Sequence, residues 1–230
     1  NGCPRPARAA EPVSFTLYIG NKSYSSWSMR PWMLLEAFGI PFSEVVIPLY
    51  VEGSKETILQ TSPSGKVPAL VDGETTVWDS LSICEYVAET FPEHAIWPKD
   101  KAARALARSM AAEMHSSFQA LRQQCGMVVH RPKGPVDFTP ETLADIARIE
   151  AMWADARERF GQGGPFLFGA YSAADAMFAP AVCRFDVYQP KLSVATHEYM
   201  DAVMAMPAWR KWIAGAAAET WRIARLEPQP

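Results

Sequence analysis

Residues 65–73, Gly-Lys-Val-Pro-Ala-Leu-Val-Asp-Gly, constrain the fold of this chain more than any other stretch of the sequence. The apolar run that ends in Asp-Gly predicts a buried strand, a tight turn and a partner strand over Thr75–Trp78. Because proline lacks a ladder donor, Pro68 is expected at the first residue of the strand or at an edge, where its peptide bond could be cis. A cis bond would turn the N–H and C=O groups of Val67 towards an extended ligand such as a peptide.

The pair Asp79-Ser80 directly precedes residues 81–91, whose pattern is helical. Backbone N–H groups are free at the start of a helix and the helix dipole favours negative charge there, so the pair predicts a carboxylate site. The alternative is that both residues only cap the helix. A peptide-binding strand edge beside an anion site predicts a surface that binds a small peptide.

The composition excludes several classes of function. The chain has 230 residues, a net charge of −3 and a pI of about 5.9, so its bulk charge does not favour nucleic acid or an anionic membrane. No apolar run reaches the roughly eighteen residues that a membrane-spanning helix needs. No metal site is predicted, because the cysteines and histidines lack ligand spacing. Cys84 and Cys183 lie in apolar helical stretches and are expected to be reduced core residues, which favours a cytoplasmic location.

The order of the predicted elements divides the chain into two domains. Residues 14–91 read as strand, helix, strand, helix, strand, strand and helix, which is the order of a thioredoxin-like α/β domain. Prolines around Trp97 end this pattern, and the later segments have a helical pattern, which predicts an all-α domain. The expected boundaries are a disordered extension at 1–13, the thioredoxin-like domain at 14–91, a linker at 92–100, the helical domain at 101–220 and a C-terminal tail at 221–230.

In the helical domain, residues 101–124 are predicted to form one helix with a polar stripe opposite its apolar one. The polar stripe consists of Arg108, Ala112, His115, Gln119 and Arg122. It is either a solvated face or one wall of a cleft, in which His115 and Arg122 polarise an electrophile or bind an acidic substrate. Ser172 and Asp175 have the spacing of a capping box and are expected to start a later helix.

Residues 25–28, Ser-Ser-Trp-Ser, join the first predicted strand to the first helix, so their amides face one end of a helix dipole. A serine hydroxyl here could donate to a thiolate, and each unit by which the pKa of the thiol falls corresponds to about 1.4 kcal/mol. The alternative is that the serines only cap the helix. If the helix begins at Pro31, which cannot donate to the helix ladder, residues 25–30 form a loop or a separate turn.

From Ser25 to Ile40, the pattern Ser-Ser-x-Ser-x-Arg, an apolar helix and Gly-Ile resembles the zeta class of glutathione transferases. Together with the Val-Pro, Asp-Ser and Ser-x-x-Asp elements, it identifies the chain as a member of the glutathione transferase superfamily over residues 14–217. The resemblance implies the glutathione transferase fold, with a thioredoxin-like α/β domain before an all-α domain, and a homodimer. Trp27 stands where the zeta class has cysteine, which sets the chain apart from its maleylacetoacetate isomerases, and the wording Tyr-Ser-Ser-Trp-Ser is similar to that of a bacterial branch.

The resemblance implies two catalytic serines and a backbone partner for glutathione. Ser25 stands at the position of the serine that activates the glutathione thiol in the zeta class, and Ser26 takes the second role. Val67, which precedes Pro68, is the implied backbone partner of the cysteinyl unit of glutathione.

The two ends of glutathione are assigned in the same way. Ser80 and its amide suit the γ-glutamyl carboxylate, and Asp79 suits the ammonium group. Lys66 either meets the glycyl carboxylate or is a solvated lysine. The residues expected beside the second substrate, a small electrophile, are Trp27, His115 and Arg122.

Two functions fit this chain. The first is an enzyme, a glutathione transferase that activates the glutathione thiol for conjugation to, or isomerisation of, a small electrophile. The second is a non-catalytic binding protein of the same fold that acts through a protein partner, for example in bacterial cell division. The C-terminal tail could serve such a partner or pack back on the core. The serine turn, Val67-Pro68 and Asp79-Ser80 together favour the enzyme.

Overall fold

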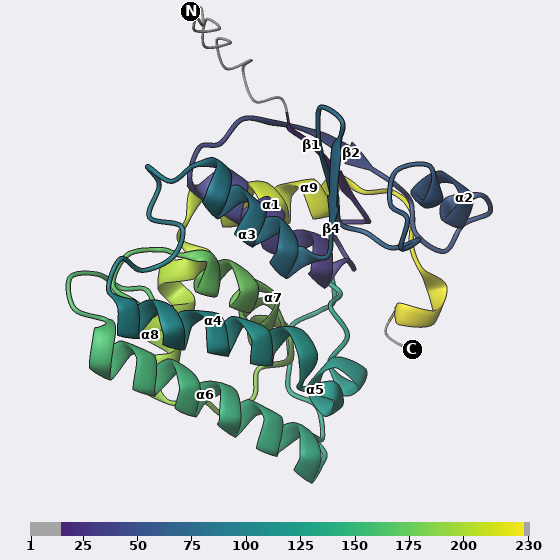
Figure 1. Ribbon diagram of the computed structural model, residues 1–230. Coiled ribbons are helices and arrows are strands. Elements are labelled where there is room, and N and C mark those ends of the chain that lie inside the picture. The colour runs from purple at the N-terminus through teal and green to yellow at the C-terminus, as the bar shows by residue number, and fades with distance from the viewer. Residues whose placement is uncertain (1–14, 228–230) are drawn as a thin grey trace, which may run out of the picture.

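The computed structural model describes residues 15–227, in which a small sheet with its helices lies against a group of longer helices (Figure 1). The extension predicted for residues 1–13 lies outside the described residues, and so does Cys3. Both predicted parts of the fold are therefore present within one compact arrangement.

The sheet is built on β1 (Phe15–Ile19), which pairs in parallel with β2 (Phe42–Val46) and antiparallel with β3 (Ala69–Asp72). A turn at Gly73 leads from β3 into β4 (Thr75–Trp78), and the strand order is β2-β1-β3-β4. The helices of this part are α1 (Ser26–Ala37), α2 (Ser54–Leu59) and α3 (Ser80–Thr90). This order confirms the thioredoxin-like domain predicted from the sequence.

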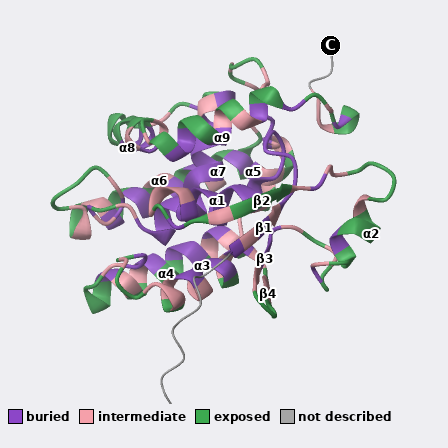
Figure 2. Cartoon of the chain, turned by 90° about the horizontal axis from the view of Figure 1, so that it is seen from above, coloured by how far each residue is buried: buried purple, intermediate pink, exposed green. Residues whose placement is uncertain are grey.

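The second part is a group of helices around a buried central helix. They are α4 (Lys101–Ser116), α5 (Gln119–Gln124), α6 (Pro140–Phe160), α7 (Ala173–Tyr188), α8 (Val194–Met204) and α9 (Pro207–Ala218), followed by a 3-10 turn at Ala224–Leu226. Helix α7 is buried along almost its whole length (Figure 2), because α1 packs against it from the sheet side and α4 from the helical side. One hydrophobic core therefore runs through both parts.

Helix α1 begins at Ser26, so the start at Pro31 considered above is wrong. Ser25 caps the helix: its hydroxyl accepts the N–H of Ser28 at 3.4 Å, and its carbonyl accepts the N–H of Met29 at 3.2 Å. The first turn is thus closed before the proline is reached. Pro31 removes one ladder donor from the helix but does not end it.

The single helix predicted over residues 101–124 is wrong, because the chain breaks between α4 and α5. Phe118 adopts a left-handed conformation with φ of 66°, and its ring is buried in the core. Arg122 turns back across the break and donates from Nε to the Ser117 carbonyl at 2.9 Å and from Nη2 to the Met114 carbonyl. Burial of the phenyl ring and the hydrogen bonds to these carbonyls offset the free-energy cost of the break. Helical periodicity in the sequence reports neither of these two contributions.

The capping box predicted at the start of α7 is confirmed. The Asp175 carboxylate is buried and accepts the N–H groups of Ser172 at 2.8 Å and Leu167 at 3.1 Å. Burial raises the pKa of Asp175 to about 6, although these hydrogen bonds oppose the rise. Asp175 therefore ties the preceding loop to the central helix.

Candidate functional site

A cavity of about 1010 Å³ brings most of the predicted site residues together. Its walls come from the β1–α1 loop, the segment around α2, the residues before β3, the start of α3, one side chain of α4 and the C-terminal segment. The predicted residues that line it are Ser25, Ser26, Trp27, Lys66, Val67, Pro68, Asp79, Ser80 and His115. Of the predicted residues, Arg122 alone does not line it.

The serine turn contributes both a helix cap and a cavity wall. The Ser25 hydroxyl donates to Ser28 Oγ at 2.7 Å, and Ser28 Oγ in turn accepts the N–H of Gly20 at 3.0 Å. The Ser26 hydroxyl forms no hydrogen bond within the described part of the chain. Ser25 therefore caps α1, as one alternative drawn from the sequence predicts, and it also lines the cavity.

The strand edge is formed by the segment that leads into β3. The Val67-Pro68 peptide bond is cis, as the sequence allowed. The paired register of β3 begins at Ala69, so Val67 lies beyond the end of the ladder and lines the cavity beside Lys66. Lys55 of α2 lines the same cavity and adds a second cation that the sequence analysis did not single out.

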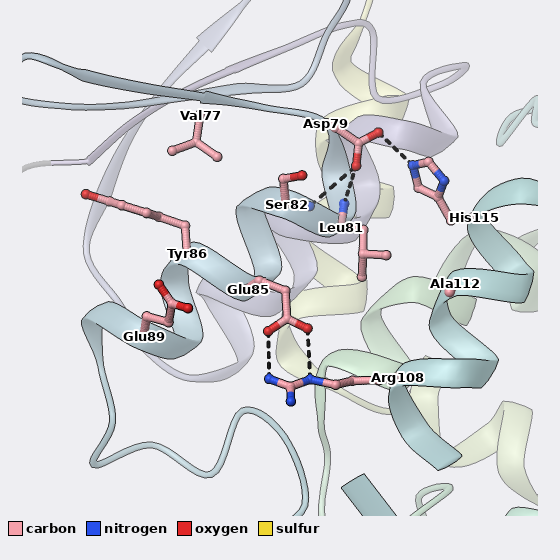
Figure 3. A pocket seen from close by; sticks show the side chains of 10 residues that line it. All are labelled: Val77, Asp79, Leu81, Ser82, Glu85, Tyr86, Glu89, Arg108, Ala112 and His115. Atoms are coloured by element: carbon pink, nitrogen blue, oxygen red, sulfur yellow. Dashed lines mark hydrogen bonds and ion pairs between the residues drawn. The ribbon is translucent and has the colours of Figure 1, made fainter. Parts of the chain in front are cut away.

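Asp79 joins the start of α3 to the helical domain (Figure 3). Its Oδ1 atom accepts the N–H of Leu81 at 2.9 Å and that of Ser82 at 3.4 Å, which caps the helix. Its Oδ2 atom lies 2.6 Å from Nε2 of His115 on α4. The backbone of Asp79 has a φ of 77°, which turns the side chain back over its own helix start.

Arg30, the arginine of the Ser-Ser-x-Ser-x-Arg pattern, is a further residue of the site that was not predicted. Its side chain is fully buried behind the cavity, where Nη1 donates to Ser80 Oγ at 3.2 Å. Burial, together with the charges of Arg122 and Arg184, lowers the pKa of Arg30 to about 9. A buried cation that contacts a cavity-lining hydroxyl favours negative charge in front of that hydroxyl.

Trp27 packs against two arginines and a histidine. The guanidinium carbon of Arg30 is 4.3 Å from the centroid of the indole, that of Arg122 is 4.9 Å away, and the His115 ring centroid is 5.2 Å away. Arg122 thus supports Trp27 from outside the cavity and does not face a ligand in it. Burial, with the charge of Arg184, lowers the pKa of Arg122 to about 10.

An apolar wall of the cavity was not predicted. It is made of Tyr24, Leu49, Tyr50 and Leu226, which come from three distant segments of the chain. No sequence signal identifies it, because its residues lie far apart in the sequence and only the fold brings them together.

A second hollow, of about 820 Å³, lies between β4, α3 and α4 and shares Asp79 and His115 with the cavity (Figure 3). Arg108 of α4 crosses it and forms two bonds with Glu85 of α3, from Nε at 3.0 Å and from Nη2 at 2.9 Å. This part of the predicted polar stripe is therefore a contact between the two parts of the chain.

Across residues 15–227, no helix is both long and apolar enough to cross a membrane. Within the same range, no three His, Cys, Asp or Glu side chains gather in a way that could hold a metal ion.

Comparison with known proteins shows the family. The model of the glutathione S-transferase N-terminal domain matches residues 24–90, and that of the C-terminal domain matches residues 103–215. The maleylacetoacetate isomerase of Rattus norvegicus is 31% identical over 190 residues, which cover 81% of this chain and 83% of that protein. The chain belongs to the glutathione S-transferase family, which confirms the resemblance and the fold predicted from the sequence.

Two further proteins are similar to the chain. A zeta-class glutathione S-transferase of Euphorbia esula is 38% identical over 118 residues, so the match spans 50% of this chain and only 52% of that relative. The crystal structure of a glutathione transferase homologue from Burkholderia gl BGR1, with bound glutathione, has a TM-score of 0.66 and 23% identity. The match covers 90% of this chain and 100% of the homologue's chain, and this likeness shows the fold.

Proposed function

We propose that this chain is a glutathione transferase that activates the glutathione thiol for conjugation to, or isomerisation of, a small electrophile. The observation that carries the proposal is that the serine turn, Val67-Pro68 and Asp79-Ser80 line one cavity. The relatives support both reactions, since one is named a glutathione S-transferase and another a maleylacetoacetate isomerase.

The residues of the cavity fit glutathione. Arg30 lies behind Ser80, and its buried Nε atom has no partner in the described part of the chain, so a carboxylate in front of Ser80 would offset its charge. Asp79 suits the ammonium group next to that carboxylate. Lys55 and Lys66 on another wall suit the glycyl carboxylate.

When bound, glutathione supplies the sulfur nucleophile. Ser25 Oγ–H donates to Ser28 in the structure, and we assign it the role of turning this proton towards the sulfur to favour the thiolate. Ser26, on the same wall, is assigned the role of the second serine of the zeta-class pair. The start of α1 adds the positive end of a helix dipole near the same place. Val67 would hold the peptide backbone, which fixes the sulfur against the electrophile.

Calorimetric titration of glutathione into the wild type, Ser80→Ala and Ser25→Ala tests the proposal. We expect micromolar to millimolar binding that weakens about tenfold in Ser80→Ala, because a hydrogen bond to a charged group is lost. Ser25→Ala should keep binding and lose turnover of electrophiles. Ser82→Ala is the matched control, because Ser82 donates to Asp79 only through its backbone N–H, which the substitution keeps. No heat and no thermal shift at several millimolar glutathione would overturn the proposal and favour the non-catalytic protein that acts through a partner.

We also propose a homodimer and a cytoplasmic location. Tyr50, Val51 and Trp78 are exposed apolar side chains that a second copy of the chain could cover. The buried free thiols of Cys84, Cys125 and Cys183 suit a reducing compartment. Light scattering after size-exclusion chromatography would check the dimer, and a monomeric mass would contradict it.

A further inference from the structure

Glu219, the first residue after α9, binds the loop that leads to the serine turn. One oxygen of its buried carboxylate accepts the N–H of Lys22 at 2.5 Å, and the other accepts the N–H of Ser23 at 3.0 Å. Two adjacent backbone donors of the β1–α1 loop are therefore satisfied by one charged side chain from the far end of the chain. Charge-assisted bonds to backbone N–H groups are among the stronger hydrogen bonds in proteins.

Two further contacts attach the same loop to α9. The Ser23 hydroxyl donates to the carbonyl of Ala216 at 3.1 Å. Gly215 makes room for the stem of Lys22, since a Cβ atom at this glycine would lie 2.8 Å from Cδ of Lys22. The end of α9 thus forms a socket, consisting of Gly215, Ala216 and Glu219, that fits this one loop.

The Lys22 side chain is itself held on the other side of the socket. Its Nζ atom forms an ion pair with Glu44 of β2 at 2.8 Å and lies 4.9 Å from the Trp32 ring centroid and 5.8 Å from that of Trp212. The Lys22 side chain therefore joins the loop to the sheet, to α1 and to α9 at once.

The position of Ser25 follows from that of the loop. The N–H of Ser25 donates to the carbonyl of Asn21 at 2.8 Å, and the N–H of Tyr24 donates to the same carbonyl at 3.1 Å. Residues 21–25 thus form one tight turn, and the socket binds the middle of it. A shift of Lys22 and Ser23 would move Ser25 relative to the cavity wall formed by Val67 and Asp79.

We infer that Glu219 is a positioning residue for Ser25, which it holds in register with the glutathione-binding wall through the backbone of Lys22 and Ser23. This inference rests on the proposed function. Glu219 does not touch the cavity, so its effect must pass through the loop.

The test compares Glu219→Gln with Glu150→Gln. A glutamine side chain offers one acceptor oxygen and one NH₂ group, so one of the two loop N–H groups loses its partner. Glu150 is the matched control, because it also accepts a backbone N–H, that of Ser193 at 2.9 Å, but between α6 and the start of α8. Hydrogen exchange of residues 20–28 is measured without glutathione, and kcat, Kd for glutathione and the pH profile of turnover are measured with it.

In Glu219→Gln we expect exchange of residues 20–28 to be about tenfold faster, kcat to fall about tenfold at neutral pH with an unchanged Kd for glutathione, and the pH profile to move to higher pH. Glu150→Gln should leave all of these unchanged. Unchanged exchange and an unchanged pH profile in Glu219→Gln would overturn the inference. Absence of glutathione binding by the wild type would refute the proposed function instead, while the exchange data would still decide whether Glu219 holds the loop.

If Glu219→Gln does not fold, Glu219→Asp serves as the second variant. It keeps the charge but shortens the side chain by one methylene, so the carboxylate cannot hold both the Lys22 and the Ser23 N–H groups at their present distances. A smaller change in the same direction, in exchange of residues 20–28 and in kcat but not in Kd, would support the inference. No change in either would overturn it.

Discussion

The Nε2 atom of His115 lies 2.6 Å from Oδ2 of Asp79, and this contact joins the proposed glutathione site to the helical domain. The sequence assigned the two residues to different substrates, glutathione for Asp79 and the electrophile for His115. The structure brings them together at the edge of the second hollow, between α3 and α4 (Figure 3). One carboxylate therefore caps a helix, contacts the other domain and is the proposed partner of an ammonium group.

Asp79→Asn separates the charge of this side chain from its capping role. Asparagine keeps an acceptor for the Leu81 N–H and tolerates the positive φ of 77° at this position. We expect Kd for glutathione to rise about tenfold, because the charged partner of the ammonium group is lost, while the free energy of unfolding falls by less than about 1 kcal/mol. Calorimetry and urea unfolding check this. Asp72→Asn, which disturbs only the bond from Tyr86 at 2.8 Å, is the control, and an unchanged Kd in Asp79→Asn would contradict the ammonium assignment.

Arg30→Met should weaken glutathione binding without destabilising the fold. The buried guanidinium is not paired with a carboxylate among the described residues, so its replacement by an apolar side chain removes a desolvation cost and leaves no partner charge uncompensated. We therefore expect a change in the free energy of unfolding within about 1 kcal/mol or an increase, with Kd for glutathione raised about tenfold. Arg184→Met is the control, since Arg184 is also buried but donates to the Cys125 and Pro180 carbonyls, away from the cavity. If both variants bind glutathione like the wild type, Arg30 has no part in the site.

The parts of the fold that the sequence predicted are those that local chemistry determines. The Asp-Gly turn defines the β3–β4 hairpin within a few residues, and Ser172 with Asp175 defines the start of α7 within one turn. The serine turn and the Asp79-Ser80 pair are equally local, so most of the cavity lining was found from patterns in the sequence.

The remaining contacts were beyond sequence reasoning because they join distant segments. Arg30 reaches Ser80 across 50 positions, and Glu219 reaches Lys22 across 197. The left-handed conformation of Phe118 is offset by burial of its ring, which helical periodicity does not report. Arg122 was placed on a continuous helix for this reason, and the break turns it towards Trp27.

Asp175 should give the stability of the protein a specific pH dependence. Burial raises the pKa of Asp175 from an ordinary value of 3.8 to about 6, so the folded state binds this proton more tightly than the unfolded chain does. Its contribution to the free energy of unfolding therefore decreases as pH rises through this window and is constant above it. The difference in the free energy of unfolding between wild type and Asp175→Asn, measured by urea unfolding, should shrink by about 3 kcal/mol as pH rises through the window. A difference that does not change with pH for Asp175→Asn would contradict the burial argument.

The C-terminal segment also reaches the serine turn through Glu227. Its carboxylate accepts the hydroxyl of Tyr24 and lies 2.9 Å from Nε2 of His130, while Leu226 beside it lines the cavity. Of the two alternatives for the tail, its described part, to Glu227, packs back on the core. Burial alone would raise the pKa of Glu227, but the hydrogen bonds from Tyr24 and His130 outweigh burial and lower it. The attachment is therefore complete above the ordinary pKa of 4.5 and is lost as pH falls through the lowered value.

Glu227→Gln should widen the cavity at neutral pH by loosening this attachment. We expect kcat/KM for large electrophiles to rise about three- to tenfold relative to small ones, because Leu226 no longer narrows the apolar wall. Hydrogen exchange of residues 222–227 should become faster in parallel, and Glu198→Gln on the exposed side of α8 should change neither quantity. Faster exchange with an unchanged ratio of kcat/KM values would mean that the electrophile does not pass Leu226.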